Sequence, residues 1–414
     1  MRGRPFPRGF WWGAATAGHQ VEGGNTTSDT WYAEHVQPTV FGEPSGPAVD
    51  SYRRWREDID LVAGLGLNAY RFSIEWARVE PAPGVVDEAA LDHYGALVDA
   101  CVATGLAPIV TFNHFTSPHW FAMRGGWLDA EAPALFAHYC DVLMDRFGGS
   151  IAAAVTMNEP NLARLLSWAG LPEVVRELER ATLTAAAKKA GVSRYRLANV
   201  VLPEEFDALA DGMTAGHRAA KAAIKVRRPE LPVGLSLAVA DDQVVGDDPG
   251  VRDRKRAEVY ARWLRLASDD DFVGVQNYER LRYDGTGPVP PPEGVPLNHM
   301  GSDIYPASLA GAVRYVHRET GVPVLVTEHG LSHDDDRLRA ELIPPALDAL
   351  QDAIADGVPV LGYVHWSLLD NFEWIFGYGP KLGLHAVDRT TFERTAKPSA
   401  AVYAAIAKAN SVPG

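Results

Sequence analysis

The chain has 414 residues, of which 47% are hydrophobic and 22% are charged, a balance typical of a globular protein with a large core. Its formal net charge of −14 argues against nucleic acid or an anionic membrane surface as a partner recognised by charge. No run of about 18 apolar residues is present, so we predict no membrane-spanning segment.

The start of the chain and the two cysteines favour a cytoplasmic protein. The first eight residues are basic but lack the apolar core of a signal peptide. Cys101 and Cys140 both lie in helix-like stretches and make no metal or redox pattern. We expect both to act as small apolar side chains and the protein to be cytoplasmic.

Short apolar runs alternate with longer helical patterns along the chain. The predicted strands are 10–17, 68–74, 107–113, 153–157, 232–237, 272–277, 324–328 and 360–367. The predicted helices are 52–64, 88–104, 133–147, 213–226, 254–267, 307–320, 337–356 and 398–410. Strands that alternate with helices indicate a parallel sheet, and eight strands are the number of a (β/α)8 barrel. We predict an α/β fold, with residues 1–414 forming a single (β/α)8 TIM barrel domain.

Two segments stand apart from this alternation. Residues 161–211 are rich in Ala, Leu, Glu and Arg and are predicted to form an atypical helical insertion after strand four. Residues 283–297 contain three consecutive prolines and are predicted to form a surface loop after strand six. Long loops at the catalytic end of a barrel usually shape substrate access, and a merely structural insertion is an equally good interpretation.

Two glutamates occupy matching places at the ends of predicted strands. Glu159 follows the apolar run 152–157, and Glu328 follows the apolar run 322–326. In a (β/α)8 barrel the carboxyl ends of the strands form the catalytic face, so we expect both carboxyl groups there. Two carboxyl groups on that face, in a chain with 11 tryptophans, indicate glycoside hydrolysis. One acid would protonate the leaving oxygen while one carboxylate attacks the sugar.

Further side chains near strand ends suit sugar recognition. Gln20 and Glu373 offer an amide and a carboxylate to adjacent hydroxyl groups, and Trp374 offers an aromatic face to the C–H surface of a sugar. His114 is placed to hold a sugar hydroxyl. For Gln20 the alternative is an ordinary loop residue, and for Trp374 it is core packing.

A charged residue on a predicted barrel strand supports the same interpretation. Arg71 needs a carboxylate partner if it is buried. Placed beside Glu328, it would keep that group ionised and oriented as a nucleophile. Asn158, next to Glu159, could hydrogen-bond the 2-hydroxyl of the sugar, a contact that strengthens in the transition state of this reaction.

A catalytic metal is the less favoured interpretation of the strand-end histidines. His114 and His119 form one pair and His329 and His333 another, but no compact ligand motif such as HExxH occurs. Residues 64–68 lack the third glycine of a dinucleotide fingerprint and precede a strand rather than follow one. We therefore predict no metal and no cofactor.

Together these segments resemble glycoside hydrolase family 1, the β-glucosidase family. The resemblance runs from residue 10 to about residue 400 and is carried by FWWGAATAGHQVEG, YRFSIEWARVEP, TMNEP, TEHG and WSLLDNFEW-x-x-GY. It implies a (β/α)8 barrel that hydrolyses β-glycosides with retention of configuration and without a cofactor.

Matched by position, Glu159 corresponds to the acid/base of that family and Glu328 to the nucleophile. Arg71 and Tyr278 correspond to residues that contact the nucleophile. The residues matched to sugar binding are Gln20, His114, Asn158, Gln276, Tyr278, Trp366, Glu373 and Trp374. A retaining geometry implies carboxyl groups about 5 Å apart. Their repulsion would raise the pKa of the acid, and Arg71 would hold the pKa of the nucleophile down.

Several positions depart from the family pattern. Gln276 replaces an asparagine, and His329 replaces the asparagine of TENG beside the nucleophile. Leu382 stands where a pocket phenylalanine is common, and Ser302 stands where a tryptophan often forms the aglycone platform. Residues 161–211 lack the Gly/Pro-rich stretch that normally follows the acid/base. The last two departures suggest a leaving-group site fitted to a bulky or hydrophobic aglycone.

The resemblance also bears on the sugar, because members that act on 6-phosphorylated sugars usually lose the glutamate at Glu373. A carboxylate there would repel phosphate, so we expect a small-molecule substrate with an unphosphorylated glycone: glucose, fucose or galactose. Two alternatives use the same fold: a transglycosidase with the same intermediate, and a catalytically silent sugar-binding barrel. A metal-dependent barrel hydrolase is a third alternative. The oligomeric state is left open.

Overall fold

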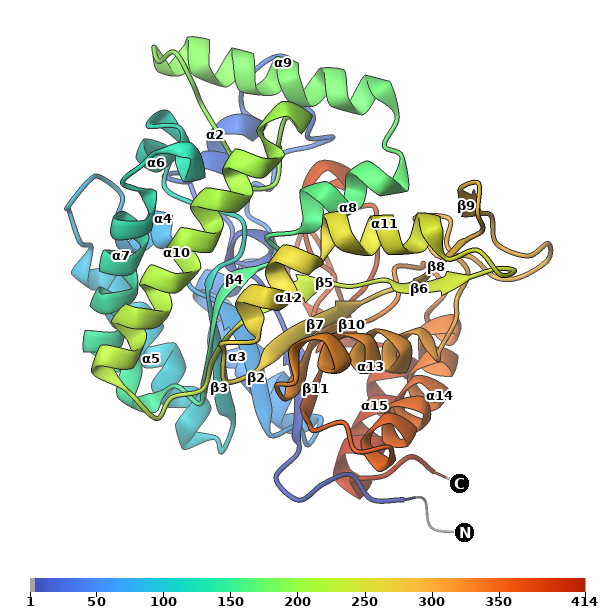
Figure 1. Ribbon diagram of the computed structural model, residues 1–414. Helices are drawn as coiled ribbons and strands as arrows, with labels where there is room; N and C mark the ends of the chain where they lie inside the picture. Colours follow the sequence, from blue (N-terminus) through green and yellow to red (C-terminus); the bar gives the residue numbers. More distant parts are fainter. Residues whose placement is uncertain (1–3, 414) are drawn as a thin grey trace.

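The computed structural model describes residues 4–413, and their centre is a closed barrel of eight parallel strands (Figure 1). The strands follow the order β1-β11-β10-β7-β5-β4-β3-β2 around the barrel. They are β1 (Trp11–Ala15), β2 (Ala69–Ser73), β3 (Ala107–Asn113), β4 (Ala153–Asn158), β5 (Val233–Ala238), β7 (Val273–Asn277), β10 (Val324–His329) and β11 (Val360–Trp366). Each coincides with a predicted strand to within a few residues, so the predicted (β/α)8 barrel is confirmed.

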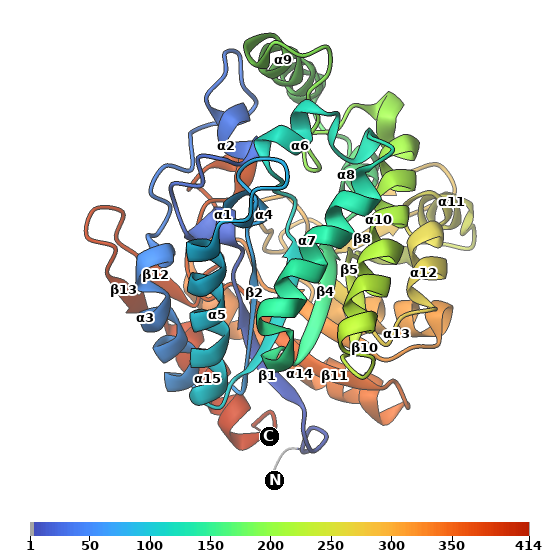
Figure 2. The same cartoon turned by 90° about the vertical axis from the view of Figure 1, so that its left-hand side faces the viewer.

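Helices form a layer around this barrel (Figure 2). The large ones are α3 (Ser51–Gly64), α5 (Glu88–Ala103), α7 (Ala132–Phe147), α10 (Phe206–Arg227), α11 (Gly250–Val259), α12 (Ala261–Ala267), α13 (Ser308–Thr320), α14 (Asp336–Ala355) and α15 (Pro398–Ala409). No helix within residues 4–413 is both long enough and apolar enough to cross a membrane. Both ends of the described part of the chain lie at the end of the barrel opposite the insertion helix α9 (Glu173–Ala190), as Figures 1 and 2 show.

Two predicted helices differ from the observed ones. The helix predicted from residue 213 begins at Phe206, because an acidic turn at 203–205 starts it earlier. The single helix predicted over 254–267 is divided into α11 and α12 at Tyr260, whose backbone has φ −116°. The Tyr260 hydroxyl is buried and accepts hydrogen bonds from Lys255 Nζ (2.7 Å) and the Ala240 amide (3.2 Å). The helix is thus interrupted at Tyr260, whose side chain makes tertiary hydrogen bonds.

Short elements occupy the loops. The additional helices are α1 (Gly18–Val21), α2 (Asp29–Glu34), α4 (Trp76–Val79), α6 (His119–Met123) and α8 (Leu162–Ala169), with 3-10 turns η1 (Gly126–Leu128), η2 (Gly148–Ser150), η3 (Pro203–Glu205) and η4 (Trp374–Phe376). The additional strands are β6 (Asp241–Val244), β8 (Arg280–Tyr283), β9 (Pro288–Val289), β12 (His385–Val387) and β13 (Arg394–Ala396). The predicted loop 283–297 is therefore partly a sheet, since β9 pairs with the end of β8.

The barrel strands are short and apolar because they are covered on both faces. Every residue of β4, β5, β7 and β10 is buried. Small and branched side chains such as Ala69, Ile109, Val155 and Val364 fill the barrel interior. A larger cluster packs between the strands and the helices. A barrel filled in this way holds the carboxyl ends of its strands rigidly, so these ends can position functional side chains.

The segment after β4 forms helices α8 and α9, in the region predicted as an insertion. Figure 1 shows α9 lying across the top of the molecule, outside the ring of barrel helices. It packs on α2, and Thr182 Oγ1 accepts a hydrogen bond from the Val40 amide (2.8 Å). A separate apolar cluster that includes Val36, Leu183 and Tyr195 joins these parts. That residues 1–414 form one domain stays a prediction.

Candidate active site

Glu159 directly follows β4 in a strained backbone conformation. Its φ is +46°, in the left-handed region that residues other than glycine rarely adopt and that is found at functional sites. The Glu159 amide donates to Ser236 O of β5 (2.9 Å). The side-chain amide of Asn161 donates to Ala238 O (2.7 Å) and accepts from the Ala238 amide (3.1 Å). These bonds to β5 fix the loop that carries Glu159.

Glu328 lies near the end of β10 and is 4% exposed. Its Oε1 accepts hydrogen bonds from Arg71 Nη1 (2.6 Å) and Gln276 Nε2 (2.8 Å). Its Oε2 accepts one from the Tyr278 hydroxyl (2.6 Å). Three donors thus hold this carboxylate, one of them a buried guanidinium, and charge-assisted bonds of this kind are the strong ones.

Arg71 joins three strands of the barrel. It lies fully buried on β2, and beyond Glu328 on β10 it donates to Asn158 Oδ1 of β4 (2.6 Å) and Thr111 Oγ1 of β3 (3.0 Å). Gln276 Nε2 also donates to Asn158 Oδ1 (2.7 Å). Asn158 Oδ1 is therefore occupied by two donors within the protein, and its amide nitrogen stays available.

The two carboxyl groups differ in their proton affinity. Burial raises the pKa of Glu328 above its usual value, although Arg71 and Tyr278 oppose that rise. Burial raises the pKa of Glu159 further, the charge of Glu328 adds to that rise, and Arg71 opposes it. No side chain within residues 4–413 hydrogen-bonds the Glu159 carboxyl group. When one proton is shared between them, it therefore resides on Glu159 and the charge on Glu328.

Arg71 lowers the pKa of Glu328, as expected, but the net shift of that pKa is nevertheless upward. The reason is that this carboxylate is almost completely removed from water, and desolvation outweighs the attraction of a single guanidinium.

Four rings lie in sequence with nearly parallel planes. His114 stacks on Trp366 (centroids 5.6 Å apart, 12° between planes) and on Trp374 (6.1 Å, 10°). Trp374 in turn stacks on His19 (5.7 Å, 8°). Three of these rings belong to residues predicted to bind sugar, and His19 is a fourth that the sequence did not single out. Burial lowers the pKa of His114 well below its usual value, so this imidazole is neutral.

Several residues of this site have a buried polar atom without a hydrogen-bond partner. Within the described part of the chain, the buried atoms at these positions that lack a hydrogen bond are Gln20 Oε1, His114 Nδ1, Asn158 Nδ2, Gln276 Oε1 and Glu373 Oε1. Leaving such an atom unpaired costs about 1–3 kcal/mol, and native proteins seldom accept it without a functional reason. Five such atoms beside two carboxyl groups and a stack of rings indicate a site for a ligand with several hydroxyl groups.

Gln20 and Glu373 reach this site from opposite ends of the sequence. The amide nitrogen of Gln20 donates to Asn371 Oδ1 (3.0 Å) and Phe372 O (2.8 Å), which ties α1 to the loop after β11. Burial raises the pKa of Glu373 to about 8. The next residue, Trp374, has φ +53°, a second strained position in the site.

The remaining sequence-predicted positions lie around this centre or away from it. His329 points away from Glu328 along the strand alternation, and its Nδ1 bonds the Tyr363 hydroxyl (2.8 Å). Leu382 is buried in the apolar cluster that contains Trp366. The Ser302 hydroxyl donates to Glu279, the residue after Tyr278. Residues 4–413 hold no group of three or more His, Cys, Asp or Glu side chains arranged to bind a metal ion.

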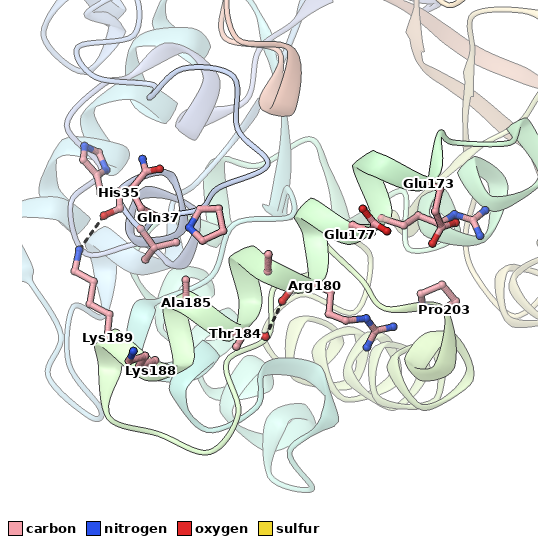
Figure 3. A pocket seen from close by; sticks show the side chains of 14 residues that line it. His35, Gln37, Glu173, Glu177, Arg180, Thr184, Ala185, Lys188, Lys189 and Pro203 are labelled. Atoms are coloured by element: carbon pink, nitrogen blue, oxygen red, sulfur yellow. Dashed lines mark hydrogen bonds between the residues drawn. The ribbon is translucent and has the colours of Figure 1, made fainter.

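A large open groove lies elsewhere on the molecule (Figure 3). It has a volume of about 950 Å³ and runs between α9 and the segment from His35 to Pro38. Arg180, Lys188 and Lys189 lie on its α9 side, and Lys189 Nζ donates to His35 O (3.0 Å). None of the residues that surround Glu159 and Glu328 lines it.

Comparison with known proteins identifies a family that matches most of the chain. The profile described as Glycosyl hydrolase family 1 matches residues 2–181 and 276–412. The chain is 32% identical to a beta-glucosidase from Agrobacterium sp., covering 97% of this chain and 95% of that protein. It is also 32% identical to a bifunctional beta-D-glucosidase/beta-D-fucosidase from Bifidobacterium breve, covering 95% and 96%.

Solved structures agree as well. A beta-glycosidase crystal structure is 48% identical, with a TM-score of 0.91 over 98% of this chain and 97% of that one. A beta-glucosidase from Thermotoga maritima in complex with deoxynojirimycin is 26% identical, with a TM-score of 0.84 over 98% and 99%.

Proposed function

The chain belongs to glycosyl hydrolase family 1 and is an O-glycosyl hydrolase, and from this premise we propose that it cleaves unphosphorylated β-D-glycosides through a covalent glycosyl-enzyme intermediate. The relatives named for glucosidase and fucosidase activity support glucosides and fucosides as substrates, with galactosides as a further candidate. The observation that carries the proposal is the pair of carboxyl groups with opposite surroundings, one held by three donors and one free to exchange a proton.

In the first step Glu328 is the nucleophile. Its carboxylate oxygen attacks the anomeric carbon while the bond from that carbon to the leaving oxygen breaks. Glu159 gives its proton to the leaving oxygen, so that the aglycone departs as a neutral alcohol. Arg71, Gln276 and Tyr278 keep the attacking carboxylate ionised and in place, which is why they surround Glu328 rather than Glu159.

In the second step Glu159 changes from acid to base. It takes a proton from a water molecule whose oxygen attacks the anomeric carbon, and the ester bond to Glu328 breaks. Formation of that ester removes the charge of Glu328, and with it the repulsion that raises the pKa of Glu159. The pKa of Glu159 then falls, so the same side chain is an acid before the ester forms and a base afterwards.

The sugar would be held by the unpaired polar atoms of the site. Gln20, His114, Asn158 and Glu373 offer hydrogen bonds to its hydroxyl groups, and the ring faces of Trp366 and Trp374 cover its C–H surfaces. Asn158 has only its amide nitrogen available, which suits it as a donor to the 2-hydroxyl oxygen.

The unphosphorylated glycone follows from the charges nearby. The carboxylate of Glu373 would repel a phosphate group on the sugar. The nearest downstream cation, Lys381, donates to Tyr378 O (2.8 Å) instead of standing free to receive one. The same pocket would accept deoxynojirimycin, the sugar mimic bound by the Thermotoga maritima relative.

We propose that the distinctive feature of this chain is its binding site for the aglycone. Ser302 is buried and bonded to Glu279, so it offers no aromatic platform to a leaving group. Met300 and Phe376, each 52% exposed, are large apolar side chains two residues from Ser302 and from Trp374 in the sequence. These features support a bulky or hydrophobic aglycone. Equal specificity constants for cellobiose and for large aromatic glucosides would contradict this part of the proposal.

The test is hydrolysis of p-nitrophenyl glycosides by the wild type, by Glu328→Gln and by the surface control Glu177→Gln. The panel contains the β-glucoside, β-fucoside, β-galactoside, β-glucoside 6-phosphate and α-glucoside. We expect turnover of the unphosphorylated β-sugars, unchanged in the control and reduced at least about 10⁴-fold in Glu328→Gln. Absence of turnover in the wild type would favour the silent sugar-binding barrel.

Two further measurements separate the remaining alternatives. A slow 2-deoxy-2-fluoro glucoside should add one sugar mass to the wild type and none to Glu328→Gln, which tests the covalent intermediate. Product analysis with added alcohols tests the transglycosidase alternative, since dominant transfer to the alcohol instead of water would favour it. That the protein acts in the cytoplasm stays a prediction from the sequence.

A further inference from the structure

The ring stack of the site continues beyond the residues that meet the sugar. Its last member, His19, is 1% exposed and lies on Trp374 with an angle of 8° between the planes. His19 belongs to α1, directly before Gln20, whose amide donates to Phe372 O. Two consecutive residues of α1 thus contact the loop that ends at Trp374. One of them, Gln20, has an atom left over for a ligand, whereas His19 has its ring fully engaged.

Trp374 needs such support because its backbone is strained. Its φ of +53° lies in the left-handed region that is unfavourable for a bulky residue, so the conformation persists only where tertiary contacts hold it. The η4 turn that contains it is three residues long and closes with the Gly377 amide donating to Trp374 O (3.0 Å). Beyond this turn, the indole ring is in contact with the rings of His19, His114 and Phe115.

His19 is held in turn by a buried carboxylate. His19 Nε2 bonds Glu34 Oε1 (2.9 Å), and Glu34 Oε2 accepts from the Ser45 amide (3.0 Å) and the Ser45 hydroxyl (2.8 Å). On the other side of the ring, Nδ1 lies 3.3 Å from Asn25 Nδ2, and the His19 amide donates to Glu75 Oε1 (3.1 Å). These contacts leave the imidazole one orientation, parallel to the indole.

A mere packing role would not require this arrangement. Burying a histidine against a carboxylate carries a desolvation penalty that an apolar ring of the same size avoids. The pairing of His19 with Glu34 fixes the orientation of the ring, because the hydrogen bond to Glu34 sets the plane of the imidazole. Burial lowers the pKa of His19, but Glu34, with Glu75 and Asp29, outweighs burial and raises that pKa overall.

We propose that His19, held by Glu34, is a positioning residue that keeps the Trp374 ring in place as the aromatic wall of the sugar site and thereby sets glycone affinity. The inference rests on the proposed function, because it assumes that Trp374 contacts the glycone. Neither His19 nor Glu34 touches the reacting atoms in this proposal. Their effect therefore passes through Trp374 and falls on binding, with little effect on the chemical step.

The test is a double-mutant cycle between His19→Ala and Trp374→Ala, read by KM and kcat for p-nitrophenyl β-glucoside and by calorimetric Kd for deoxynojirimycin. We expect His19→Ala to raise KM and Kd about tenfold, equivalent to about 1.4 kcal/mol, with kcat changed less than about threefold. In the Trp374→Ala background, His19→Ala should change Kd less than about twofold, because the partner through which it acts is gone. A further tenfold loss there would overturn the proposal, as would an unchanged Kd in His19→Ala alone.

Two variants guard against misfolding and against a general effect of losing a histidine. Glu34→Ala removes the partner of His19 Nε2 and should raise Kd about as much as His19→Ala. The matched control is His35→Ala. His35 also stacks on a tryptophan, Trp31 (4.7 Å, 26°), but lies on the surface at the end of α2, and its loss should leave Kd unchanged.

The binding measurement also separates this inference from the proposed function. A wild type that binds deoxynojirimycin but turns over no β-glucoside would refute the proposed hydrolysis, and the cycle in Kd would still decide the role of His19. If His19→Ala does not fold, His19→Phe replaces it. That variant keeps a ring without the bond to Glu34, and its loss of affinity should vanish in the Trp374→Ala background.

Discussion

Glu159 and Glu328 are the same residue type at equivalent places of the barrel, yet their surroundings are opposite. Glu328 is buried and accepts hydrogen bonds from Arg71, Gln276 and Tyr278. Glu159 has a left-handed backbone, and its carboxyl group has no side-chain hydrogen-bond partner within residues 4–413. The difference shows that the neighbours set the proton affinity of each group, since the carboxyl groups themselves are identical.

The contrast suits the two tasks in the proposed mechanism. A nucleophile must stay ionised and aimed, so several fixed donors serve it well. An acid/base must hold a proton, release it and take up another, and permanent donors would hinder that by stabilising the carboxylate alone. The unfavourable conformation of Glu159 is confined to its backbone, so its carboxyl group can still gain and lose a proton.

The largest effect that would sharpen this contrast is expected from Glu159→Gln. Removing the acid should reduce kcat/KM for an alkyl β-glucoside by about 10²–10⁴-fold, the usual contribution of general acid catalysis. The loss should be much smaller for a dinitrophenyl glucoside, whose leaving group needs no proton. Glu328→Gln should lose activity on both substrates alike. Equal losses of kcat/KM on both substrates in Glu159→Gln would contradict the proposed difference between the roles of Glu159 and Glu328.

A medium effect is expected from Tyr278→Phe, which removes one of the three donors to Glu328. A hydrogen bond to a charged group contributes about 1.5–3 kcal/mol, so kcat/KM should fall by roughly 10–100-fold. The Tyr278 bond lowers the pKa of Glu328, and its loss should raise that pKa. Activity requires ionised Glu328, so the acidic limb of the pH–rate profile should move to higher pH. Measured pH profiles of kcat/KM check this, with Tyr32→Phe as a control outside the site.

The smallest effect is expected on the pKa of Glu159 when Glu328 is replaced by an uncharged residue. In Glu328→Gln the repulsion that helps raise the pKa of Glu159 disappears, so that pKa should fall toward the value that burial alone imposes. Carbon NMR titration of labelled glutamate carboxyl groups in the wild type and in Glu328→Gln would measure the change. A pKa of Glu159 that stays the same or rises would mean that the two carboxyl groups do not interact.

Much of the fold and of the site was predictable because its signals are local. Each barrel strand is a short apolar run bounded by polar residues, so its position is written in the neighbouring letters. Glu159 and Glu328 stand out because each directly ends such a run. The structure brings the sugar-binding candidates together, since strand ends of a closed barrel meet at one face. Their roles stay proposals.

What tertiary structure alone decided depends on contacts between residues far apart in the chain. Arg71 and Glu328 are separated by 257 positions and Gln20 and Phe372 by 352, so no local pattern could show which donors meet which acceptors. The same holds for His19 and Glu34, which look like ordinary loop residues until Trp374 is placed beside them. The upward shift of the Glu328 pKa also required the structure, because desolvation depends on everything packed around a group. Local patterns thus determine which elements form and where they end, whereas proton affinity and ring orientation arise only when distant segments exclude water together.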